Sequence, residues 1–85
     1  MSTGTQIARQ HIHVMKDGAF VVDWGEGQVQ DLMTGEFMRI DDAEILHVIY
    51  DAELDILTRR GRVLDYNSQD VFLAPLPESG RRTLD

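Results

Sequence analysis

The stretch DDAEILHVIYDAELDILTRR, residues 41–60, decides the fold, because the turn signals that recur regularly before it stop there. Asp41 followed by Glu44 is typical of a capping box, and the two arginines at the end of the stretch suit the negative end of a helix dipole. Gly61 follows directly and is well placed to end a helix. The stretch therefore predicts one long amphipathic helix over residues 41–60.

A strand followed by a shorter helix is the alternative for the same stretch. Asp51 can also act as an N-cap, and the residues before it are mostly β-branched or aromatic, which favours a strand. This alternative places a strand over residues 44–50 and a helix over residues 52–60. Both interpretations remain open from the sequence alone.

Short apolar segments surround this stretch on both sides. Before it, the turn signals KDG, GEG and TG separate four segments of ordinary strand length, expected at residues 11–15, 19–24, 28–33 and 36–40. After it, residues 62–66 and 71–76 flank the turn-like NSQD and predict a hairpin. The expected fold class is α+β, with an antiparallel meander, one helix and a C-terminal hairpin. A mainly-β small barrel with a short helix is the alternative.

The two ends of the chain are polar and small in character. They predict flexible tails over residues 1–10 and 77–85, on either side of one compact domain over residues 11–76. The chain has no cysteine, so a disulfide framework and a thiolate metal site are both excluded. No apolar stretch approaches the roughly 20 residues of a membrane span, and no export signal is present. We therefore expect a soluble, cytoplasmic protein without membrane contact.

Acidic residues dominate the middle of the chain. The whole sequence has 15 acids and 8 bases, a net charge of −7, which argues against direct binding to nucleic acid. Residues 17–58 hold eleven acids and only Arg39 in opposition, a net charge of −10. The candidates for an acidic surface are Asp17, Asp23, Glu26, Asp31, Glu36, Asp41, Asp42, Glu44, Asp51 and Asp55.

This acidic surface has two interpretations. The first is solubility, since a moderately negative charge is ordinary for a small domain. The second is imitation of the phosphates of nucleic acid, by which a small protein of the phage or mobile-element type inhibits a DNA- or RNA-processing complex.

The histidines are the candidate metal ligands. His11 and His13 would share one face of a strand, but such a pair needs a third ligand. His47 is the remaining histidine, and it falls on the expected solvent-facing stripe of the long helix. No metal or other cofactor is expected, and a pH-dependent protein contact is the more economical role for His11 and His13. No serine lies in a nucleophile motif, so we do not expect an enzyme.

The expected long helix would be apolar over more than half of its circumference. One sheet cannot cover so wide an apolar face, and an exposed apolar patch usually marks an interface. The sequence therefore predicts a small, acidic, non-enzymatic protein that binds another protein and forms a homodimer through this helix. The interface candidates are Leu46, Ile49, Tyr50, Ile56 and Trp24.

Overall fold

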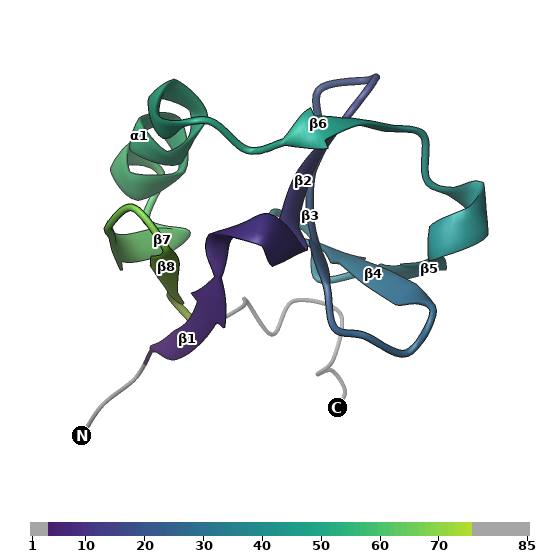
Figure 1. The fold of residues 1–85 in the computed structure, drawn as a ribbon, viewed down its shortest axis with the longest axis horizontal. Helices are drawn as coiled ribbons and strands as arrows, with labels where there is room; N and C mark the ends of the chain where they lie inside the picture. Colours follow the sequence, from purple (N-terminus) through teal and green to yellow (C-terminus); the bar gives the residue numbers. More distant parts are fainter. Residues whose placement is uncertain (1–3, 76–85) are drawn as a thin grey trace, which may run out of the picture.

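A computed structural model describes residues 4–75 of the chain. In that part, eight strands form two antiparallel sheets, and one α-helix lies beside the smaller sheet (Figure 1). The predicted α+β fold class is confirmed, with more strands than the sequence suggested.

The larger sheet has five strands in the order β5-β4-β3-β2-β6. Its strands are β2 (Ile12–Met15), β3 (Phe20–Asp23), β4 (Gln28–Asp31), β5 (Phe37–Arg39) and β6 (Ile45–Val48). Strands β2 to β5 lie inside the four ranges that the turn signals predicted, and each pairs with the next along the chain. The predicted meander is therefore present, and β6 extends it beside β2.

Aspartates shape the turns of this meander. The Asp17 carboxylate accepts the Ala19 N–H at 3.0 Å, and the Asp23 carboxylate accepts the Gly25 N–H at 2.8 Å. Asp31 does the same in the next turn, where its carboxylate accepts two backbone N–H groups. Such side-chain to backbone bonds stabilise tight turns, which explains why the local sequence predicts them well.

Residues 41–60 do not form one helix, so our prediction of a long helix is wrong. They contain the end of a single 3-10 turn, η2 (Ile40–Asp42), then strand β6, then helix α1 (Asp51–Arg59). The alternative of a strand followed by a shorter helix is confirmed. The physical reason is tertiary pairing: the β-branched residues of this segment gain a neighbour in β2 and bury Ile49 in the core.

The smaller sheet joins the two ends of the described region, with strands in the order β1-β8-β7. Its members are β1 (Thr5–Ala8), β7 (Val63–Tyr66) and β8 (Asp70–Leu73). The hairpin β7–β8 lies where the sequence predicted it. Residues 5–8, by contrast, were expected in a tail, and they instead pair with β8 and bury Ile7. The tail expected over residues 77–85 lies outside the described residues.

Two apolar clusters form the core. The main cluster lies between the two sheets and α1, and it includes Ile12, Val22, Ile49, Leu54 and Leu57. The smaller cluster packs on the other face of the larger sheet around Met15, Val21 and Val29. Alternation along β3 supplies both clusters, because successive side chains of a strand leave opposite faces.

Within residues 4–75, no helix has the length and apolar character needed to cross a membrane.

The helix α1 offers a test of this packing. Leu57 is fully buried, whereas its neighbour Ile56 is 38% exposed. We expect Leu57→Ala to lower the free energy of unfolding by about 2–5 kcal/mol, because it leaves a cavity. Ile56→Ala, the control in the same helix, should lower it by about 1 kcal/mol or less. Urea denaturation measures both, and equal losses would contradict the observed orientation of the helix.

Candidate protein-binding surface on strand β6

Strand β6 lies at the edge of the larger sheet. It pairs with β2, with His13 opposite Val48 and Val14 opposite His47. In residues 4–75 no strand pairs with its other edge. An edge strand presents backbone donors and acceptors that another chain can pair with, so its side chains and surroundings decide whether it binds.

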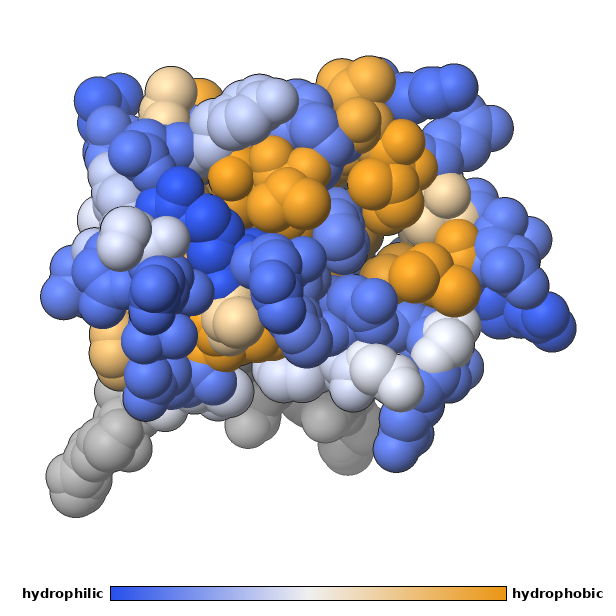
Figure 2. Space-filling model, in the orientation of Figure 1, coloured by the Kyte–Doolittle hydropathy of each residue, from blue (hydrophilic) through white to orange (hydrophobic). Residues whose placement is uncertain are grey.

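Three exposed side chains follow one another at alternate positions along and just after β6. Leu46 is 56% exposed, Val48 40% and Tyr50 61%, whereas the intervening His47 is partly buried and Ile49 is only 1% exposed. We call Leu46, Val48 and Tyr50 the β6 row. Figure 2 shows apolar surface gathered over the part of the molecule where β6 lies, with hydrophilic surface around it. The row therefore lies in a region of exposed apolar surface with a hydrophilic border.

A cluster of three side chains fixes the end of β6 to the first turn of α1. His47 Nε2 lies 2.9 Å from one carboxylate oxygen of Glu53 and 3.0 Å from the other. Glu53 also accepts the Tyr50 N–H at 2.8 Å, and the rings of His47 and Tyr50 stack with centroids 4.5 Å apart. Tyr50 is therefore held in place although its side chain is exposed, which lowers the entropy lost when it contacts a partner.

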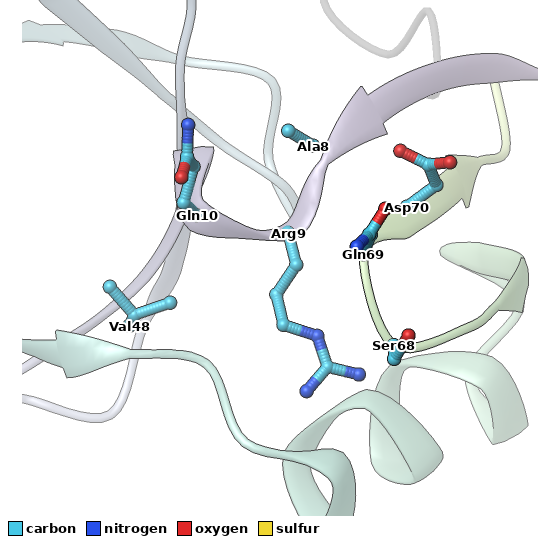
Figure 3. Close-up of a pocket in the computed structure, with 7 residues that line it drawn as sticks. All are labelled: Ala8, Arg9, Gln10, Val48, Ser68, Gln69 and Asp70. Carbon is cyan, nitrogen blue, oxygen red and sulfur yellow. The ribbon is translucent and has the colours of Figure 1, made fainter.

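A shallow pocket of about 490 Å³ adjoins the row at Val48. Figure 3 shows it between the 3-10 turn η1 (Arg9–His11) and the β7–β8 turn, with Gln10, Ser68 and Gln69 in its lining. The Arg9 guanidinium points toward α1, where it lies 2.7 Å from Asp51 and donates to the Asn67 carbonyl at 3.0 Å. The charge of Arg9 is thus already paired. The pocket is a mainly polar site that lies beside the β6 row at Val48.

The interface candidates are divided by the structure. Leu46, Tyr50, Ile56 and Trp24 are exposed. Ile49 is not, because its N–H donates to the Ile12 carbonyl at 3.1 Å and its side chain lies in the main core. Its place on an interface is therefore a correction to the prediction. Val48 was missed, and the alternation of residues 45–49 under the strand interpretation was the signal that could have found it.

The three histidines are separated into two places. His11 lies in η1, with Nδ1 3.3 Å from the Asp23 carbonyl oxygen, and His13 lies on β2. His47 is bound to Glu53 instead. Among residues 4–75, no three histidine, aspartate or glutamate side chains gather as a metal site would require.

The fold changes the titration of His13. Its Nδ1 atom is buried and has no hydrogen-bond partner among residues 4–75. Burial lowers the pKa of His13, the charge of Asp23 partly opposes this, and the nearby His11 adds to it. The neutral ring is therefore the form that the folded protein prefers.

Most of the predicted acidic residues take part in internal contacts. Besides the three turn aspartates, Asp51 pairs with Arg9, Asp41 lies 3.5 Å from Arg39, and Asp55 accepts a hydrogen bond from the Tyr66 hydroxyl. Four of the ten predicted acids have side chains without a hydrogen bond or ion pair to any residue in 4–75: Glu26, Glu36, Asp42 and Glu44. Two of these four, Asp42 and Glu44, come directly before β6.

Comparisons of this chain with protein-family models, with curated proteins and with solved structures gave no match. The candidate surface is therefore argued from its geometry alone.

The lowered pKa of His13 predicts a pH dependence of stability. Since the unfolded chain binds a proton at this ring more readily than the folded one, stability is complete above the unfolded pKa of 6.5 and falls as the pH drops below it. His13→Gln should therefore lose less stability than the wild type between about pH 7.5 and pH 5.5. Urea denaturation at both pH values measures this. Equal losses in the two proteins would contradict it.

The Glu53 contacts predict a graded loss of stability. Glu53→Ala removes the acceptor for the Tyr50 N–H and the partner of His47, which should cost about 1–2 kcal/mol of unfolding free energy. Glu53→Gln keeps an amide oxygen in the same place and should cost less. Urea denaturation of both variants tests this order, and a larger loss for Glu53→Gln would refute it.

Proposed function

We propose that this protein is a non-enzymatic binding module that docks another protein on the β6 row. The observation that carries the proposal is the set of three exposed side chains, Leu46, Val48 and Tyr50, on and beside a strand with a free edge. Exposed apolar surface with a polar border is typical of protein interfaces, and an exposed tyrosine such as Tyr50, at the end of the row, is a common anchor. The His47–Glu53 cluster supports the same role, since it holds Tyr50 in one position.

Self-association is a weaker form of this proposal. It was expected because one long helix seemed to have a surplus apolar face, but α1 has nine residues and buries Leu54 and Leu57. The apolar residues that remain exposed on this part of the chain lie mainly along β6. A homodimer formed through residues 41–60 would therefore use β6 rather than the helix.

The alternative of a nucleic-acid mimic rests on the acidic residues. Six of the ten predicted members of the acidic surface make internal contacts, so local structure accounts for much of their presence. A mimic predicts a partner whose capture weakens steeply as salt rises, whatever happens to the β6 row.

A charge placed in the row tests the proposal. Leu46→Asp should reduce capture of the protein's partner from a lysate of the native host at least tenfold, because it puts a carboxylate into an apolar contact. Leu64→Asp is the matched control, since Leu64 is 51% exposed but lies on β7 in the other sheet. Light scattering of each protein alone reports self-association, and circular dichroism checks that each variant is folded.

Two results would overturn the proposal. The first is capture that Leu46→Asp leaves unchanged. The second is capture that Leu46→Asp and Leu64→Asp reduce equally, because the effect would then not depend on β6. A folded control variant is needed for either conclusion.

A further inference from the structure

Strand β6 offers a backbone template as well as side chains. Its ladder with β2 uses one edge: the Ile49 N–H donates to the Ile12 carbonyl at 3.1 Å, and the Glu44 carbonyl accepts from Lys16 N–H at 2.9 Å. In an antiparallel ladder, residues that alternate with the paired ones direct their N–H and C=O groups to the opposite edge. An extended segment of another chain can therefore pair with that edge.

The edge is short and interrupted. The register between β6 and β2 shifts between Val14 and Met15, which places one extra residue on β6. Such bulges bend an edge strand and limit indiscriminate pairing. The regular part of the edge covers His47 and Val48, because the Tyr50 N–H is already bonded to Glu53, and the pocket beside Val48 borders it. This geometry suits a short added strand better than an extended sheet-to-sheet contact.

The charge around β6 indicates what kind of segment fits. Asp42 and Glu44 precede the strand with carboxylates that pair with no residue in 4–75, and residues 17–58 as a whole carry a net charge of −10. Of the nearby cations, Arg39 lies beside Asp41, Arg9 is paired with Asp51, and Lys16 is left exposed. Because the Debye length is about 8 Å at physiological salt, the two flanking carboxylates matter most. They favour a basic partner.

A second copy of this chain fits the edge poorly. Antiparallel pairing of two β6 strands about a two-fold axis near His47 would bring Glu44 of one copy to the Tyr50–Asp51 end of the other. Glu44 of each copy would then lie near Asp51 of the other, whose charge Arg9 already pairs, between two chains that each carry a net charge of −7. Like charges placed opposite each other across strands are destabilising.

We infer that β6 accepts an extended segment of a different protein as an added strand, and that this segment carries lysine or arginine beside its apolar residues. This inference rests on the proposed function, since it uses the same β6 row. The apolar side chains of the segment would contact Leu46, Val48 and Tyr50, while its cations would lie near Asp42 and Glu44. The backbone pairing gives affinity, and the flanking charge gives selectivity.

A peptide selection on the full chain tests the inference. The probe is a phage-displayed library of random dodecapeptides, selected on the wild type and counter-selected on Leu46→Asp. Enriched peptides are then synthesised, and their affinity is measured by fluorescence anisotropy at about 50 and about 300 mM salt. We expect alternating β-branched or aromatic residues with an excess of lysine and arginine. Their affinity should be at least tenfold higher for the wild type than for Leu46→Asp.

Charge reversal separates local from overall electrostatics. The double variant Asp42→Lys, Glu44→Lys should weaken peptide binding at least fivefold. The double variant Glu26→Lys, Glu36→Lys has the same net charge and reverses two equally unpaired acids in the β3–β4 and β4–β5 turns, so it should bind nearly as the wild type does. Hydrogen exchange of the complex should show new protection of amides within residues 45–50.

The outcomes distinguish this inference from the proposed function. Enriched peptides that need Leu46 but have no basic excess, or that are indifferent to the Asp42 and Glu44 reversal, overturn the inference and leave the binding module standing. Binding without new amide protection in β6 overturns strand addition in favour of side-chain docking. If no selected peptide needs Leu46, the inference fails, and the lysate capture with Leu46→Asp decides the proposed function separately.

Discussion

The carboxylate of Glu53 is the group on which the arrangement of β6 and α1 depends. It binds the Tyr50 N–H, which defines where the helix begins, and it binds His47, which fixes the strand that comes before. Both bonds are made by the one Glu53 side chain. A change in the relative position of β6 and α1 would therefore break at least one of them. The bend between them turns the apolar faces of both elements in different directions, so that Leu54 and Leu57 enter the core while Leu46 and Val48 stay outside.

The parts of the fold that depend on local chemistry could be predicted. Aspartate and glycine in the meander turns make hydrogen bonds within a few residues, so a short window of sequence contains the whole interaction. Strand β1 could not be predicted in this way. Its residues 5–8 hold one large apolar side chain, Ile7, and what makes them a strand is β8, which lies far along the sequence.

The start of helix α1 shows why the structure of residues 41–60 was hard to predict. Asp41 and Glu44 match a familiar capping pattern, but Asp41 lies in a single 3-10 turn and Glu44 directly precedes β6. Tyr50 is an unusual residue at the start of a helix and is the one used. The same error affected the choice of binding candidates, because those within residues 41–60 were chosen for a single long helix. Leu46, Tyr50 and Ile56 are exposed, but for reasons of strand alternation and helix orientation, while Ile49 alternates inward and is buried. Whether the exposed ones bind a partner stays a prediction.

The pairing of β1 with β8 has a consequence for the order of folding. Thr5 lies opposite Leu73, so this ladder closes a loop that contains nearly the whole described chain. The loss of chain entropy on closing so long a loop is recovered only after the β7–β8 hairpin and the main core exist. We therefore expect strand β1 to join last and to detach first. Each such detachment would uncover the edge of β8 that β1 covers in the folded sheet, in addition to the outer edges that the folded molecule already has.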